Sequence, residues 1–323
     1  MKRVSLIVTA CLAALASLGA DASAQNWPTK PIKAYIPFSA GSATDIIPRT
    51  VFERVAADLG QPIIVENRGG AGGTIAVGAV VKAEPDGHTI LANSSAHTVA
   101  PSIIDNIPYD TAKDLSAVVA FGKNANILVV SPAKGWKTVG DLVAAAKARP
   151  GTVNYASAGV GTATHVSAER FRQSAGIEAT HVPYRGGPEA LADIFGGRVD
   201  FYYCPISTAL PLIRDGRVVA LAASTPQRAA ALPNVPTSLE AGYANSDYTI
   251  WYGVFMPAKT PRAIIDKFYT TTMQAIATPA MQQKLAELAL EPMPMKPAEF
   301  DALVETEIKA NEKLIKGAGL KPN

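Results

Sequence analysis

The chain has 323 residues, of which 48% are hydrophobic and 18% are charged, and its formal net charge is +3. So small a net charge argues against a nucleic-acid-binding surface, which needs a concentrated basic face. The 24 prolines and 25 glycines indicate a compact chain with many turns.

The N-terminal residues have the order of a bacterial secretory signal. Lys2 and Arg3 form a basic start, residues 4–18 are a run of apolar and small residues, and Ala22-Ser23-Ala24 is a small-x-small site. The apolar run is shorter than the roughly 20 residues that span a bilayer. We therefore expect a signal peptide at 1–24, cleavage after Ala24 and a periplasmic protein.

The positions of the two cysteines predict that the mature chain has no internal disulfide. Cys11 follows Val8-Thr9-Ala10, which loosely resembles a lipidation box, but almost no apolar segment precedes it. Cleavage after Ala24 leaves Cys204 alone, so no internal disulfide can form. Cys204 ends an apolar stretch, which predicts a small buried thiol rather than a nucleophile.

Predicted strands and helices alternate along the mature chain. The predicted strands are residues 32–37, 63–65, 89–92, 126–130, 153–156, 181–184, 199–203 and 218–223. Helical patterns lie at 47–59, 74–81, 138–149, 165–172 and 297–316. This alternation predicts an α/β fold with mostly parallel sheets flanked by helices. About 300 mature residues are long for one core, and no linker stands out, so we expect two lobes joined by crossing strands.

One helix has a readable start and end. Thr138 and Asp141 have the spacing of a capping box, in which each residue bonds the backbone of the other. The Arg-Pro-Gly segment at 149–151 predicts the end of the same helix.

The sequence contains no recognisable catalytic or metal-binding motif. It has no Gly-x-Ser-x-Gly elbow and no His-Glu-x-x-His motif. The segment 159–164 begins like a dinucleotide-binding loop but lacks the third glycine. The histidines, which have no metal-ligand spacing, are His88, His97, His165 and His181. We expect no enzyme activity, no metal and no cofactor.

Two turns between a strand and a helix are candidate anion sites. They are residues 38–45 and 157–162. A helix N-terminus offers unpaired N–H groups and a partial positive charge, so a carboxylate docks there without a buried lysine. Each turn alone is also explained by simple helix capping. Asp45 is expected to be an N-cap, which would place Pro48 in the first helical turn.

Three further side chains are candidate members of a site. Arg185 follows a predicted strand and would pair with a carboxylate in a two-point fork, although a solvated surface arginine explains it equally well. Phe38 and Trp251 would suit the wall of a pocket, and Trp251 is more simply a core residue.

Together these segments resemble the substrate-binding proteins of tripartite tricarboxylate transporters, the Bug family. The segments are 27–32 (WPTKPI), 37–45 (PFSAGSATD), 65–73 (VENRGGAGG), 85–87 (PDG), 157–162 (SAGVGT) with His165, 181–186 (HVPYRG), 236–242 (PTSLEAG) and 251–253 (WYG). They cover essentially the whole mature chain in order.

The resemblance implies a two-lobed periplasmic binding protein fold with two crossing strands. Lobe 1 would comprise 25–123 and 223–323, and lobe 2 would comprise 124–222. The lobes would close around a small organic carboxylate, which is then delivered to membrane permease subunits. The implied ligand-binding residues are Phe38, Ser39, Ala40, Gly41, Ser42, Thr44, Asp45, Ser94, Ser95, Ser157, Ala158, Gly161, Thr162, His165, Tyr184 and Gly186.

Departures from the family pattern leave the ligand open. Ser39 and Ser42 replace residues that in relatives are commonly proline and glycine, Gly69 stands where proline is usual, and Pro48 is unusual in the first helix. A linear dicarboxylate is preferred to an aromatic acid. A periplasmic sensor that signals to a membrane kinase and a periplasmic hydrolase are the alternatives. We expect a monomer.

Overall fold

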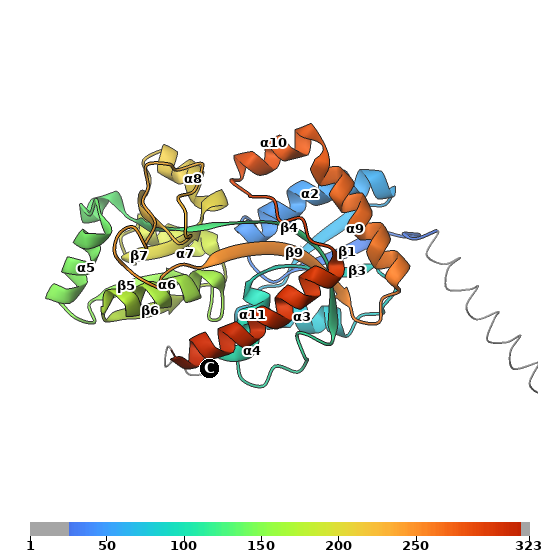
Figure 1. Ribbon diagram of the computed structural model, residues 1–323, viewed down its shortest axis with the longest axis horizontal. Coiled ribbons are helices and arrows are strands. Elements are labelled where there is room, and N and C mark those ends of the chain that lie inside the picture. Colours follow the sequence, from blue (N-terminus) through green and yellow to red (C-terminus); the bar gives the residue numbers. More distant parts are fainter. Residues whose placement is uncertain (1–25, 318–323) are drawn as a thin grey trace, which may run out of the picture.

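The computed structural model describes residues 26–317, so the predicted signal peptide and its cleavage site lie outside the described residues. Nine strands form one curled sheet that two lobes share, with helices on its faces (Figure 1). The strands are β1 (Ile32–Ile36), β2 (Ile63–Asn67), β3 (Thr89–Ser94), β4 (Leu115–Val130), β5 (Val153–Ser157), β6 (Ala179–Pro183), β7 (Phe201–Pro205), β8 (Val219–Ala223) and β9 (Thr249–Pro257).

In the first lobe, β1 pairs in parallel with β2 and β3, and β3 pairs antiparallel with β9. The helices of this lobe are α2 (Ala43–Leu59), α3 (Thr74–Val81), α4 (Ala96–Ile103), α9 (Arg262–Ala277), α10 (Pro279–Glu287) and α11 (Pro297–Gly317), with the 3₁₀ turn η1 (Ala71–Gly73).

The two sides of β9 pack against different helices, because successive side chains of a strand point to opposite faces. Tyr252 and Val254 share a core with α2 and α9. Trp251 and Phe255 pack instead with α3 and α11. Trp251 donates its ring N–H to Glu307 Oε2 at 2.9 Å, so it is a core residue, as the sequence favoured.

The second lobe repeats the parallel pattern, because β5 pairs in parallel with β6 and β7. Its helices are α5 (Val139–Ala148), α6 (Ala163–Ala175), α7 (Gly187–Phe195) and α8 (Ile206–Arg214), with the 3₁₀ turn η2 (Pro132–Lys134). The predicted capping box of α5 is confirmed: the Thr138 hydroxyl accepts from Asp141 N, and the Asp141 carboxylate accepts from Thr138 N. As predicted, α5 ends before Pro150.

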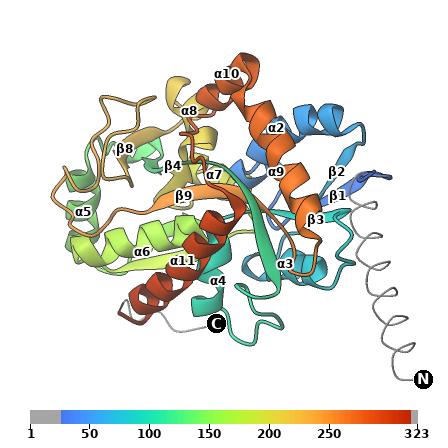
Figure 2. The same cartoon turned by 45° about the vertical axis from the view of Figure 1, so that its right-hand side comes forward.

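Two antiparallel strands cross between the lobes (Figures 1 and 2). The first part of β4 pairs with β9, and from Asn126 onward β4 pairs with β7 and β8. The chain returns beside it, where Tyr248 N donates to Ser224 O at 2.6 Å. The sequence pattern predicted only 126–130 as a strand, because the polar residues at 122–124 interrupt the apolar run.

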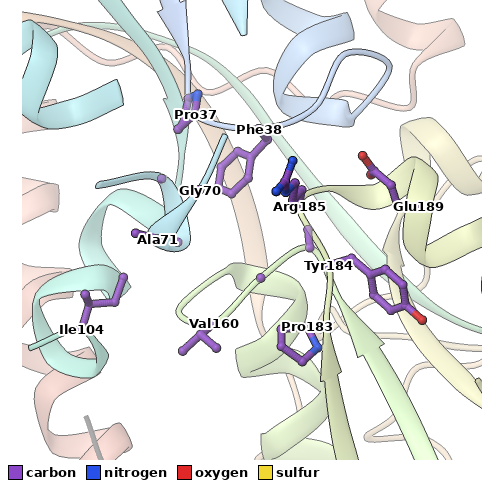
Figure 3. A pocket seen from close by; sticks show the side chains of 14 residues that line it. Pro37, Phe38, Gly70, Ala71, Ile104, Val160, Pro183, Tyr184, Arg185 and Glu189 are labelled. Carbon is purple, nitrogen blue, oxygen red and sulfur yellow. The ribbon is translucent and has the colours of Figure 1, made fainter. Parts of the chain in front are cut away.

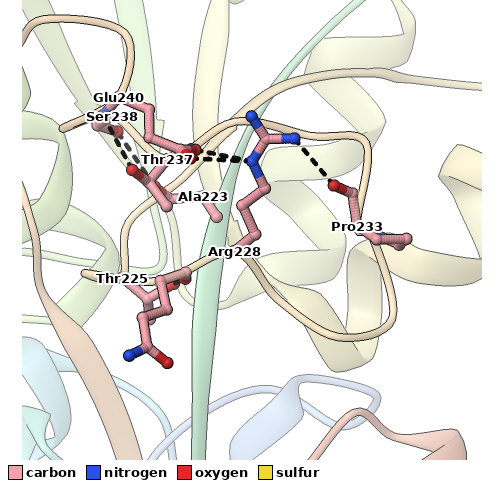
Figure 4. A network of polar contacts seen from close by, with 8 residues as sticks. Ala223, Thr225, Arg228, Pro233, Thr237, Ser238 and Glu240 are labelled. Carbon is pink, nitrogen blue, oxygen red and sulfur yellow. Dashed lines mark hydrogen bonds and ion pairs between the residues drawn. The ribbon is translucent and has the colours of Figure 1, made fainter.

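A polar network holds the long segment between β8 and β9 (Figure 4). Arg228 pairs with Glu240 at 2.8 Å and also donates to the carbonyl of Pro233 at 3.0 Å. Glu240 in turn accepts from Thr237 N at 2.8 Å. The family-like segment 236–242 therefore shapes this return path.

Candidate ligand-binding site

The first turns of α2 and α6 both line a small chamber between the lobes. Each helix begins just after a central strand of its lobe, β1 or β5. The chamber volume is about 30 Å³, room for about two water molecules or one carboxylate group. Its lining residues are Phe38, Ser42, Ala43, Thr44, Ser94, Ala158, Thr162, Ala163, Thr164, Gly187, Tyr202, Pro205, Thr208 and Ile250.

The two helix N-termini differ in how they are capped. Thr162 caps α6, since its hydroxyl accepts from His165 N at 3.4 Å and donates to Gly159 O at 2.7 Å. Ser42 is the N-cap of α2 but makes no side-chain cap. Its hydroxyl is buried, with 6% of the residue exposed, and finds no hydrogen-bond partner among the described residues. A buried hydroxyl without a partner is costly, and a ligand in the chamber would satisfy it.

A larger cavity of about 720 Å³ adjoins the chamber (Figure 3). This volume lies within the range of small-molecule sites. Phe38 and Ala158 line both spaces. The larger cavity is walled by segment 70–73 and Ile104 from the first lobe and by 158–160, 183–185 and Glu189 from the second. The two spaces therefore lie beside one another and differ greatly in size.

Several loop amides that the sequence assigned to an anion are bonded within the protein. Gly41 N donates to Asp45 Oδ2 at 2.9 Å, and Gly161 N donates to His165 Nδ1 at 3.4 Å. Ala158 N donates to Thr164 Oγ1 at 2.9 Å. The first helical residues, Ala43 and Thr44 of α2 and Ala163 and Thr164 of α6, line the chamber instead. The N–H groups at the start of a helix have no acceptor in the preceding turn of that helix.

Asp45 is not the N-cap of α2, and that prediction was wrong. The helix begins at Ala43, so Asp45 lies in the first turn and Pro48 lies further inside the helix, past that turn. From there the Asp45 carboxylate reaches back to Gly41 N and also accepts from Arg49 Nε at 2.7 Å. A carboxylate at the third helical position bonds the preceding backbone in this way in capping boxes. Asp45 therefore holds the loop.

A stack of aromatic rings lies behind the second loop. His165 and His181 stack with ring centroids 4.1 Å apart, and Tyr155 stacks on His181 at 4.9 Å. Burial lowers the pKa of His165 to about 4 and that of His181 to about 3, so both rings are neutral near pH 7. His165 accepts from Gly161 N, and this bond fixes the loop without placing the ring in the chamber.

Ser157 and His181 form a pair that superficially resembles a nucleophile and its base, with Oγ and Nε2 2.6 Å apart. Ser157 is fully buried, and its hydroxyl also accepts from Gly159 N at 3.1 Å. A nucleophile must be reachable by its substrate, and Ser157 lines neither space. The pair therefore supports the loop.

The two lobes touch beside the larger cavity, which Glu189 lines. The Ser39 hydroxyl donates to Glu189 Oε1 at 2.7 Å. A Cβ atom placed on Gly186 would lie 2.8 Å from Ser39 Cβ. Ser39 and Gly186 therefore contact one another across the cleft rather than line either space.

Seven of the predicted site residues line the chamber or the cavity. They are Phe38, Ser42, Thr44, Ser94, Ala158, Thr162 and Tyr184. The Tyr184 hydroxyl turns away and donates to Asp193 Oδ2 at 2.5 Å, which leaves the ring as the lining part (Figure 3). The predicted residues that line neither space are Ser39, Ala40, Gly41, Asp45, Ser95, Ser157, Gly161, His165 and Gly186.

Other lining residues had little signal in the sequence. Ala43 and Ala163 contribute backbone rather than side-chain chemistry, so residue type does not mark them. Tyr202 lies in β7, a fully buried strand that reads as core. Thr164 was nearest to detection, because it follows the Gly-x-Gly turn at 159–161, and its hydroxyl accepts from Ala158 N just before that turn.

Neither a reactive thiol nor a metal-binding cluster is found in the part of the chain that the structure describes. Cys204 is fully buried, and burial raises the pKa of its thiol. Among residues 26–317, no three His, Cys, Asp or Glu side chains gather as metal ligands would. No helix in this part of the chain is both long enough and apolar enough to cross a membrane.

A family model described as the tripartite tricarboxylate transporter family receptor matches residues 47–320. The chain belongs to this family. BugT of Bordetella pertussis is 31% identical over 318 residues, which cover 98% of each chain. The match to the whole length of a Bug protein confirms the resemblance seen in the sequence.

Solved structures agree with this assignment. R. palustris Rpa4515 with adipate superposes with a TM-score of 0.89 and 31% identity, covering 92% of this chain and all of that one. MatC from Rhodopseudomonas palustris with bound malate gives a TM-score of 0.86 and 29% identity, covering 90% of this chain and 100% of that chain. Receptors of this family are periplasmic solute-binding proteins and not enzymes. The predicted two-lobed periplasmic binding protein fold is confirmed.

Proposed function

We propose that this receptor binds a small organic carboxylate, with preference for a dicarboxylate, between its lobes and delivers it to a tripartite tricarboxylate-type permease. The observation that carries the proposal is the buried, partnerless Ser42 hydroxyl beside the first turns of α2 and α6, which both line the chamber. One carboxylate in the chamber would accept from this hydroxyl and meet the positive ends of two helices.

The charge balance of the chamber supports an anion rather than a cation. Its lining includes no acidic side chain, and the nearby Asp45 carboxylate is already bonded to Gly41 N, Arg49 and Asn67. The helix ends supply positive potential without a buried lysine or arginine. Adipate and malate in two related receptors are both dicarboxylates, which supports that ligand class.

Closure would couple binding to transport. We propose that the lobes divide at residues 25–123 with 223–323 against 124–222, as the resemblance implies. A carboxylate in the chamber contacts α2 and α6 together only when the lobes are closed, so ligand favours the closed form. The permease would recognise that form of a monomeric receptor, exported to the periplasm by residues 1–24 and cleaved after Ala24.

Thermal unfolding tests the proposal. Mature protein, stripped of co-purified ligand, is heated with mono-, di- and tricarboxylates and with aromatic acids. A ligand that binds only the native state stabilises it by about 2.7 kcal/mol at a hundredfold excess over its Kd, and so raises Tm. We expect a concentration-dependent rise with short dicarboxylates. No rise with any acid would refute the proposal.

A further inference from the structure

Arg185 is an uncommitted cation in the wall of the larger cavity. It follows directly on β6 and Tyr184, and its exposed side chain lies between Phe38 and Glu189 (Figure 3). Among residues 26–317, no side chain or carbonyl forms a hydrogen bond or ion pair with its guanidinium group. A guanidinium group presents a planar fork of donors that matches a carboxylate at two points.

Glu189 would be the natural partner of Arg185, because both side chains line the same cavity. Its carboxylate is engaged elsewhere: Oε1 accepts from the Ser39 hydroxyl of the other lobe at 2.7 Å. Glu189 also lies in the first turn of α7, where the helix dipole stabilises a negative charge. Within the described residues this carboxylate forms no ion pair with Arg185, and the bond from Ser39 occupies one of its two oxygens.

We infer that Arg185 is the residue that selects for a second carboxylate, and that Ser39 keeps it available by holding Glu189. This rests on the proposed function, in which the first carboxylate occupies the chamber. The chamber and the cavity share two lining residues, Phe38 and Ala158. The inference places the carbon chain of a linear diacid beside these two residues. Its far end then reaches the cavity that Arg185 lines.

The inference gives Ser39 a reason to differ from the proline common in relatives. Proline has no hydroxyl to donate, so a proline here would release Glu189 to pair with Arg185. An internal pair of this kind would compete with a ligand carboxylate. Ser39 thus acts on specificity through Glu189 and without touching the ligand.

The experiment compares diacids from succinate to suberate with the monoacids of equal carbon number, butyrate to octanoate. Affinities are measured by calorimetry for the mature protein, for Arg185→Met and Arg185→Lys, and for Ser39→Ala. Arg149→Met is the matched control, since Arg149 is an exposed arginine of the same lobe at the end of α5.

We expect Arg185→Met to weaken binding of the best diacid by about 10- to 100-fold, because hydrogen bonds between charged groups have this strength. Binding of the monoacid of equal carbon number should weaken by less than about threefold. Arg185→Lys should recover part of the loss, and Arg149→Met should change neither ligand. Ser39→Ala should weaken binding of the diacid by about 3- to 10-fold. The double variant with Glu189→Gln should restore this affinity, because a neutral amide no longer pairs with Arg185.

The outcomes separate the inference from the function on which it rests. The role of Arg185 would be overturned if Arg185→Met lost equal affinity for the diacid and the monoacid. It would also be overturned if the wild-type protein bound monoacids as tightly as diacids. Either result would leave the proposal of a carboxylate receptor intact. Ser39→Ala that Glu189→Gln does not rescue would overturn the role of Ser39. Wild-type protein that binds no acid of either series would overturn the proposed function itself.

Discussion

Replacing Gly186 with alanine should oppose closure of the cleft without damaging either lobe. The backbone of Gly186 is extended, with φ −178° and ψ 178°, so alanine adopts it without strain. The added Cβ would lie 2.8 Å from Ser39 Cβ and 2.9 Å from Ser39 Oγ. Both atoms belong to the opposite lobe, and separation of the lobes relieves these contacts. The third near atom, Glu189 Oε2 at 3.2 Å, is the far end of a flexible side chain of the same lobe and can move aside.

The size of the effect follows from the contact distances. Two carbon atoms pack best about 3.5–4.0 Å apart, so the closed form must open by roughly 1 Å at this point. Overpacking by one methyl group costs about 1–3 kcal/mol in a core. Since only the closed form carries this cost, we expect ligand to bind about 5- to 150-fold more weakly.

The assay is calorimetric titration with the dicarboxylate that gives the largest thermal shift, together with Tm of the ligand-free protein. Gly69→Ala is the matched control, because its Cβ would make an ordinary contact of 3.7 Å with the Arg185 carbonyl oxygen across the same cleft. We expect Gly69→Ala to bind normally and both variants to keep a wild-type Tm. Because the substitution destabilises only the closed form, the loss of affinity should appear mainly as faster dissociation of the ligand.

Unchanged affinity in Gly186→Ala would refute this reasoning, since it would mean that the bound form does not bring Ser39 and Gly186 together. A fall of several degrees in the Tm of ligand-free Gly186→Ala would also refute the claim that only the closed form carries the steric cost. That result would place the steric cost within lobe 2 rather than between the lobes.

Three further predictions follow from buried groups near the site and in the core. Ser42→Ala should weaken dicarboxylate binding by about 3- to 10-fold in titrations without lowering Tm, because the lost hydroxyl has no partner in the ligand-free protein. A lower Tm would show that Ser42 has a structural role. Thr162→Ala should lower the free energy of unfolding in urea by about 1 kcal/mol through loss of the α6 N-cap, and an unchanged urea midpoint would contradict that role. His97 is fully buried, and burial lowers its pKa to about 3, so the unfolded chain takes up protons first and stability falls as pH drops below about 6.5. His97→Leu should reduce the loss of stability between pH 7 and pH 5 by about 2 kcal/mol, and an equal loss in both proteins would refute the assignment.

The sequence predicted local structure well where the signal is local. The capping box of Thr138 and Asp141 needs only four residues, and the structure reproduces it. Helical spacing predicted α2, α3 and α11, although the predicted start of α2 was late. These features depend on hydrogen bonds and side-chain periodicity within one segment, which the order of residues states directly.

Strands buried on both faces were harder to find. Nearly every residue of β9 is buried, so it lacks the alternation of polar and apolar residues that marks a half-exposed strand. The first part of β4 was missed for a related reason, since Gly122, Lys123 and Asn124 interrupt its apolar run. Gly122 and Asn124 are buried while Lys123 between them is exposed, and that burial depends on the crossing between the lobes.

The sequence by itself determined the family, the α/β class and the two turns whose residues line the chamber, because these follow from motif order and from glycine and serine at helix starts. Only the tertiary structure decided which groups are free. Asp45 and His165 are occupied by loop amides, Glu189 is held by Ser39, and Ser42 is left without a partner. Availability of a polar group depends on neighbours distant in the chain, and residue order does not state which neighbours those are.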